Sequence, residues 1–164
     1  GADLNNAILS GVDLSGADLT GATLTGADLS GTDLRDAILT NTTLTQITWS
    51  KKTILSGANM SGADLTQAQL SGIDMSGADL TNADLGKFAR LRDANLSNAN
   101  LTSAILTDAI LTDANLYRAD LTNANLTGAI LGDANLLRAD LTNADLTDAN
   151  LGDAILLFAD LAGA

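Results

Sequence analysis

Aspartate is the residue type with the most chemistry available to it in this sequence. All 20 acidic residues of the 164-residue chain are Asp, and Cys and His are absent. Their absence removes thiol catalysis, disulfides, the usual zinc sites and the commonest general base near neutral pH. What remains is carboxylate chemistry, most plainly in a series that recurs every 20 residues: Asp93, Asp113, Asp133 and Asp153.

Two arginines run beside this series. Arg118 and Arg138 share its 20-residue spacing, and they are followed by a second acidic series, Asp120, Asp140 and Asp160. We expect the arginines to offset both acidic series through exposed contacts, each worth well under ~1 kcal/mol. A weak divalent-cation site between stacked Asp residues is the alternative. The spacing resembles no known calcium loop, so we predict no metal, cofactor-binding or catalytic residues.

A repeat of five residues sets the position of every Asp. Leu4, Leu9 and Leu14 begin a series in which a small residue, usually Ala, stands two residues before each Leu. The frame slips by one residue near 51–52 and again near 87–88, which leaves 32 pentads in three runs. Leu, Met or Trp at the centre and Ala two residues earlier are the candidate interior, and all Asp residues fall on the other positions.

A period of five fits neither regular helix nor flat strand. An α-helix needs apolar spacings of three and four, and a strand needs strict alternation. The pattern does fit a short extended piece, in which residues two apart point the same way, followed by a turn made by Gly, Asn or Asp. Each pentad then forms one side of a coil, and the coils stack as a solenoid.

The number of sides follows from a longer period. Residues 110–129 and 130–149 are identical at 16 of 20 positions. Four pentads per coil explain this period, so we predict eight coils in a single all-β domain, 1–164, of roughly 38 Å at ~4.8 Å per layer. The predicted core is represented by the following centres: Leu4, Leu29, Trp49, Met60, Met75, Leu96, Leu116, Leu136 and Leu156.

Units such as Ala78-Asp79-Leu80-Thr81-Asn82 and Ala94-Asn95-Leu96-Ser97-Asn98 resemble the pentapeptide repeat family. The resemblance covers essentially the whole chain. It implies a right-handed quadrilateral parallel β-helix filled by Leu and Ala. The family is abundant in cyanobacteria, where most members have no assigned activity, and a minority of members elsewhere act as DNA mimics on DNA gyrase.

The two slips gather unusual residues. Trp49 and Ile47 are larger than the usual Leu and Ala, as is Ile73, and we expect the coil to widen around them. Phe88 is expected to fold over the second slip as a cover. Most of the basic residues also lie here, on neighbouring corners about two layers apart: Lys51, Lys52, Lys87, Arg90 and Arg92. They form either a solvated bulge that relieves acidic repulsion or a docking surface for an acidic partner.

The C-terminal coils carry apolar residues at outward positions. Tyr117, Leu137 and Leu157 stand where Ser or Thr is usual, and Phe158 follows. Exposed apolar groups often mark contacts, and solenoids need covered ends. We predict self-association through these residues, end to end or near the C-terminus. An outer aliphatic ladder that stabilises the last coils is the alternative.

The composition favours a non-catalytic scaffold that binds an unidentified protein partner. A filled solenoid offers no dry, concave site for catalysis, so we predict that the chain is not an enzyme. The alternative is a DNA mimic that binds a topoisomerase such as DNA gyrase. Against it, the net charge of -12 divides into -5 for residues 1–50, +1 for 51–92 and -8 for 93–164. With few aromatics, no long apolar run and no visible signal peptide, we expect no direct nucleic-acid or membrane binding and a cytoplasmic location.

Overall fold

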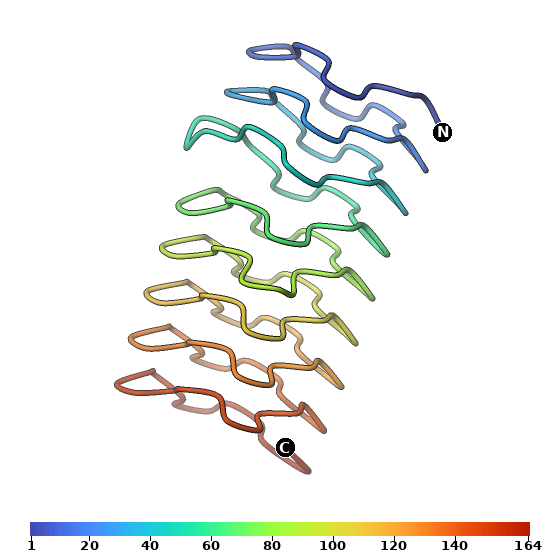
Figure 1. Cartoon of the computed structure of the whole chain (residues 1–164). Helices are drawn as coiled ribbons and strands as arrows, with labels where there is room; N and C mark the ends of the chain where they lie inside the picture. The colour runs from blue at the N-terminus through green and yellow to red at the C-terminus, as the bar shows by residue number, and fades with distance from the viewer.

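The computed structural model, which describes residues 1–164, is a stack of similar coils that runs from the N-terminus to the C-terminus (Figure 1). There is no helix and no continuous strand. Each pentad instead contributes one residue to a parallel bridge with a neighbouring coil, and the bridged residues are 20 or 21 apart. Nothing in the chain is a helix long and apolar enough to cross a membrane.

The bridges form four ladders, which we call sides 1 to 4 in chain order. Side 1 begins Asp3–Thr23–Thr43, side 2 Ile8–Asp28–Thr48, side 3 Asp13–Asp33–Ile54, and side 4 Asp18–Ile38–Asn59. The turn that joins two sides is a corner. A bridge has a separation of 21 residues wherever the pair spans one of the two slips, as in Asp33–Ile54 and Asp84–Ile105. The first slip therefore lies at the 2–3 corner and the second at the 1–2 corner, two coils later.

Backbone hydrogen bonds explain why each side is so short. The Leu4 N–H donates to the Thr23 carbonyl of the next coil at 2.8 Å, and the Thr23 N–H donates back to Ala2 at 3.0 Å. The Ala7 N–H then donates to the Leu4 carbonyl at 3.0 Å and closes the corner. The last turn residue must adopt positive φ, as in Gly11 (φ 69°) and Asp113 (φ 59°), which accounts for Gly, Asn and Asp there.

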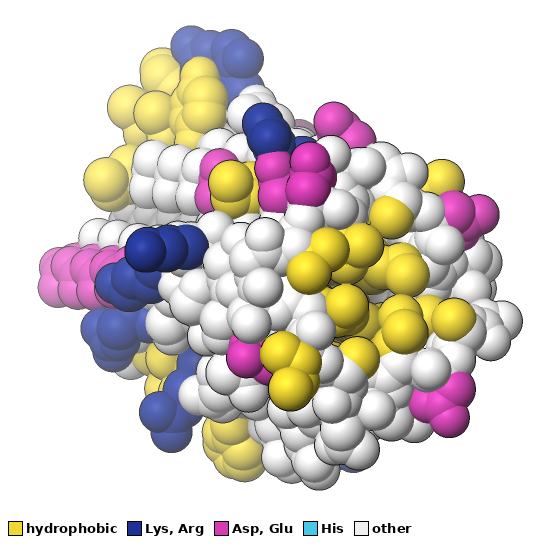
Figure 2. Space-filling model, turned by 90° about the horizontal axis from the view of Figure 1, so that it is seen from above, with side chains coloured by type: hydrophobic (Ala, Val, Ile, Leu, Met, Phe, Trp, Pro, Cys, Tyr) yellow, Lys and Arg dark blue, Asp and Glu magenta, His cyan; other side chains and the backbone are white.

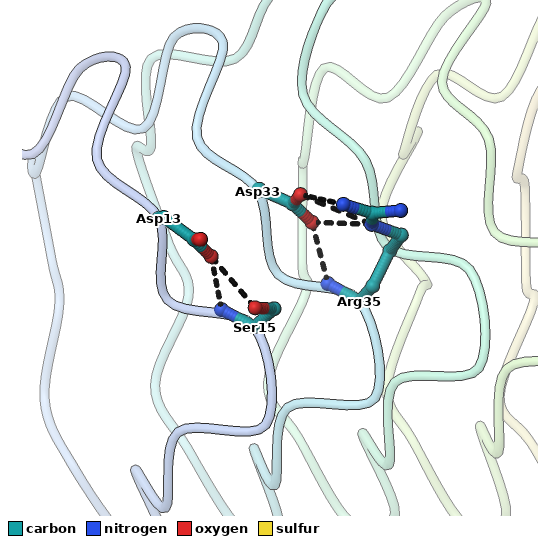
Figure 3. A network of polar contacts seen from close by, with 4 residues as sticks. All are labelled: Asp13, Ser15, Asp33 and Arg35. Carbon is teal, nitrogen blue, oxygen red and sulfur yellow. Dashed lines mark hydrogen bonds and ion pairs between the residues drawn. The ribbon is translucent and has the colours of Figure 1, made fainter.

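Many aspartates have a structural role at the corners. The Asp13 carboxylate accepts hydrogen bonds from the Ser15 hydroxyl and N–H at 2.7 and 3.0 Å, and Asp33 accepts from the Arg35 N–H and guanidinium (Figure 3). Hydrogen bonds from the Ser15 hydroxyl and N–H hold the pKa of the Asp13 carboxyl below its ordinary value. Their stabilising effect is present at neutral pH and is lost as the pH falls through that lowered pKa.

The interior is a continuous column of Leu and Ala. Among the predicted core centres, six are fully buried: Leu29, Met60, Met75, Leu96, Leu116 and Leu136. Leu4 and Leu156 are half-buried because they lie in the first and last coils, where one neighbouring layer is missing. Trp49 is also only partly buried, whereas Ile47 and Ile73 fit inside.

The stack predicts that the same substitution has very different costs in the middle and at the end of the solenoid. Leu116→Ala removes a fully buried side chain and should destabilise the protein by about 2–5 kcal/mol. Leu161→Ala is the matched control, because Leu161 is 42% exposed and the loss should be about 1 kcal/mol or less. Urea denaturation monitored by circular dichroism measures both losses, and equal shifts of the midpoint would contradict this assignment of the core.

Candidate binding surface

Side 2 has the least acidic ladder of the four sides. Its ladder contains a single aspartate, Asp28, whereas the ladder of side 4 contains five: Asp18, Asp79, Asp120, Asp140 and Asp160. Between the first slip and the C-terminal end, the ladder residues of side 2 are all uncharged or basic: Gln69, Arg90, Ile110, Ile130 and Asn150. In the coils of the two slips, a partner with negative charge therefore meets little repulsion from this ladder. In the later coils the 2–3 corner beside it carries the acidic series Asp93, Asp113, Asp133 and Asp153.

The five basic residues of the slips are placed on or beside side 2, and we call them the basic cluster. Arg90 is a ladder residue of this side, bridged to Gln69 and Ile110, and Arg92 follows it. Lys51 and Lys52 lie at the 2–3 corner, where the Lys51 side chain extends over Gly72 of the next coil. Lys87 lies at the 1–2 corner, so the cluster spans the full width of side 2.

Most of this positive charge is free to act on a partner. Only Arg92 is paired, with Asp113 at 3.2 Å, and both side chains are about half exposed, so this ion pair is weak. Lys51, Lys52, Lys87 and Arg90 form no ion pair. Seen from above, Lys and Arg side chains gather at the left of the molecule beside a receding stack of acidic side chains (Figure 2).

The other three cations are engaged elsewhere, which corrects one expectation. Arg35 pairs with Asp33, the Arg118 guanidinium lies 5.1 Å from the centre of the Tyr117 ring, and Arg138 lies 5.9 Å from that of Phe158. Neither Arg118 nor Arg138 forms an ion pair, so they do not offset the acidic series through direct contacts. The reason is that each has an aromatic ring beside it at the same corner, which the spacing of charged residues alone does not reveal.

The first slip opens the ladder of side 2. Thr48 and Gln69 face each other in neighbouring coils but form no bridge, and the Trp49 and Gln69 N–H groups have no hydrogen-bond partner. The large Trp49 and Ile47 side chains explain this, because they occupy positions that hold Leu and Ala in other coils. The Trp49 indole Nε1 is buried and likewise unpartnered.

A cavity of about 310 Å³ lies at the adjacent 1–2 corner and is lined by polar residues only: Thr45, Gln46, Thr66 and Gln67. We call it the corner opening. This site was not predicted from the sequence. The signal was nevertheless present, because two Thr-Gln pairs stand 21 residues apart, which is one coil across a slip.

Phe88 corrects a second expectation. Instead of covering the slip, it is 63% exposed. Lys87 and Phe88 are consecutive residues with positive φ, 54° and 68°, and this double turn carries the inserted residue outward. The ring is therefore available to a partner beside the cation of Lys87.

The apolar residues of the C-terminal coils lie together at the 3–4 corner. Tyr117 and Leu137 are half-buried, whereas Leu157 and Phe158 are 60% and 72% exposed. The Arg118 N–H donates to the Leu137 carbonyl and the Arg138 N–H to that of Leu157, which places these residues in successive layers. Self-association through this ladder stays a prediction.

Comparison with known proteins places this geometry in a family. The pentapeptide repeats family matches the chain in eight copies over residues 1–36, 51–82, 89–128 and 119–156. The chain therefore belongs to the pentapeptide repeat family, whose members form β-helices. Comparison with curated protein sequences found no match.

Solved structures include one clear likeness. HetL, a pentapeptide repeat protein involved in heterocyst differentiation regulation in the cyanobacterium Nostoc, is 35% identical with a TM-score of 0.82, over 98% of this chain and 73% of HetL. Full-length QnrB1, a plasmid-mediated fluoroquinolone resistance protein, is 22% identical with a TM-score of 0.40, over 99% of this chain and 90% of its own. A pentapeptide repeat protein of the Arabidopsis thaliana thylakoid lumen is 29% identical with a TM-score of 0.34, over 85% of this chain and 72% of that protein.

The exposed ladder predicts a testable association. If copies meet through Leu157 and Phe158, light scattering should give a mass above that of the monomer for the wild type, and Leu157→Asp should lower it by placing a charge in the contact. Ile38→Asp is the control, because Ile38 is also exposed but lies on side 4. If the wild type is a monomer and the Leu157→Asp variant has the same mass, self-association through this ladder is contradicted.

Proposed function

We propose that this protein is a non-catalytic scaffold that binds an acidic partner protein through side 2. The observation that carries the proposal is the basic cluster, four of whose members are unpaired, on or beside the least acidic ladder of a chain with net charge -12. Similarity to HetL, a protein involved in regulation, supports a regulatory binding role over a catalytic one.

The charges of the protein would mainly determine how an approaching partner is oriented. Acidic sides repel an acidic partner, and the basic cluster attracts it, so an approaching partner is turned towards side 2 before contact. Because the cations are exposed, each pair adds little affinity and is screened over about 8 Å at physiological salt. The proposed complex is therefore expected to weaken as salt rises.

The chemistry of the side chains supports a role without catalysis. The corner opening is lined by Thr and Gln side chains, and it contains no carboxylate, Lys or aromatic hydroxyl that could act as an acid or base. The aspartates with lowered pKa values accept hydrogen bonds from the turn residues two positions later, as Asp18 does from Thr20, so those shifts have a structural cause.

For the solenoid itself, we infer the right-handed hand that is usual in the family and eight coils of four pentads. The bridge register of 20 residues, with 21 across each slip, supports this coil length. A regular stack of this kind gives side 2 a flat surface, which suits contact with another protein.

The DNA-mimic alternative, binding to a topoisomerase such as DNA gyrase, has less support. B-DNA presents one charge per ~1.7 Å without interruption, whereas here the acidic surface is broken by the basic cluster. We expect micromolar protein to leave gyrase supercoiling unchanged and to give no protection against a quinolone. Inhibition or protection that persists at physiological salt would favour mimicry instead.

The proposed function is tested by pull-down from a cell extract with matched charge variants. Replacing Lys51, Lys52, Lys87, Arg90 and Arg92 by Gln should reduce recovery of the bound partner at least tenfold. The control replaces the remaining cations by Gln: Arg35, Arg118 and Arg138. It should retain the partner, and recovery by the wild type should fall with added salt. Equal recovery by the two variants would contradict the assignment of side 2.

A further inference from the structure

The corner opening has an excess of unused hydrogen-bond donors. On side 1, the Leu44 N–H still donates to Asp64 at 2.8 Å, but two residues later the Gln46 N–H has no acceptor. The equivalent groups one coil before and one coil after are paired: Gly26 donates to Thr45 at 3.1 Å and Gln67 to Gly86 at 3.3 Å. At the 1–2 corner the gap is thus confined to the two coils of Gln46 and Gln67, and it continues along side 2 between Thr48 and Gln69.

The neighbouring N–H adds a second free donor. At most corners where Asp or Asn stands two residues earlier, the first turn residue donates to that side chain, as Thr66 does to Asp64 at 3.0 Å. Thr43 stands at that earlier position for Thr45 and offers no carboxylate, and the Thr45 N–H has no partner. Gln46 has positive φ (56°) whereas Thr45 does not, and such an alternation directs successive N–H groups into one concave site that suits an anion.

The charges around the opening complete a carboxylate site. Lys87 follows Gln67 in the next coil at the same corner, ~4.8 Å further along the stack. The carboxylate of Asp64, two residues before Thr66, lies on side 1 and accepts from the Thr66 N–H, and it does not line the opening. The exposed ring of Phe88 stands beside Lys87 and offers an apolar wall for the methylene groups of an acidic side chain.

We propose that the corner opening anchors the partner of the proposed function by taking the carboxylate of one Glu or Asp in an extended acidic segment. Free N–H groups of Thr45 and Gln46, with the side-chain amides of Gln46 and Gln67, donate to that carboxylate, and Lys87 supplies the opposite charge. The segment then crosses side 2 towards Arg90 and Arg92. Side 2 is one pentad wide, so about four or five extended residues, at ~3.3 Å each, cover it. This inference rests on the proposed function and specifies which groups of the binding surface contact the acidic partner.

The experiment uses an N-acetylated, amidated octaglutamate peptide as the probe, with octaglutamine as its uncharged counterpart. Fluorescence anisotropy of the labelled peptide measures affinity. Emission of Trp49, the only Trp, reports events beside the opening. We expect octaglutamate to bind the wild type and shift Trp49 emission in a saturable way, and octaglutamine to do neither.

Two variants decide where the peptide sits. The double variant Gln46→Met, Gln67→Met keeps side-chain length at two turn positions and removes the amides, and it should weaken binding at least tenfold. Lys87→Gln introduces the residue found at this corner in the two preceding coils and should weaken binding at least threefold. The matched control is Asn123→Met, Asn143→Met, at turn positions of similar φ on the 4–1 corner, which does not border side 2; this variant should bind like the wild type. Thermal denaturation checks that every variant is folded.

The outcomes separate this inference from the proposed function. Wild-type affinity in both the double variant and Lys87→Gln, or binding without a change in Trp49 emission, would overturn the corner opening as the anchor. If, in that case, the variant that lacks the basic cluster does not bind octaglutamate, the proposed function stands without the corner opening as its anchor. If octaglutamate does not bind the wild type at all, the carboxylate inference fails, and the pull-down decides the proposed function independently.

Discussion

The register of the backbone ladder is the constraint on which the whole structure depends. Each coil must return after 20 residues for its N–H and carbonyl groups to meet those of the next coil, as the Leu4–Thr23 and Thr23–Ala2 bonds do. That length encloses an interior that Leu and Ala fill. The two extra residues are both accommodated at corners, and the coils separate beside Trp49, the largest interior side chain.

Trp49 shows how this constraint connects packing to a surface. The large side chains of Trp49 and Ile47 lie where the Thr48–Gln69 bridge is missing. Backbone donors are unpaired there, beside a polar opening. The Trp49 indole Nε1 is buried without a partner, and a group of that kind typically costs about 1–3 kcal/mol. The chain retains this cost beside the basic cluster, which links the packing defect to the candidate binding surface.

The repeat made the larger features predictable. A period of five indicates which residues point inward, and the 20-residue identity indicates which corners stack, so the grouping of Lys51 and Arg92 near side 2 follows from counting. Other features depend on competition between nearby side chains. Arg118 could have paired with an aspartate or stacked on Tyr117, and Phe88 could have covered its bulge. Neither choice is encoded in spacing. The corner opening depends on how far two coils separate around Trp49, which is a question of volume rather than pattern.

Irregularity also solves a problem that regular solenoids share. A side built from identical layers offers a partner the same pattern every ~4.8 Å, so the partner could bind in several registers of similar energy. Here two lysines, a polar opening and an exposed Phe88 lie at the slips in successive layers. This combination of features occurs once along the stack. A partner that contacts all three cannot shift by one coil without losing at least one of them. The departures from the repeat therefore give a binding surface its single register, while the regular pentads supply the rigid frame that holds it.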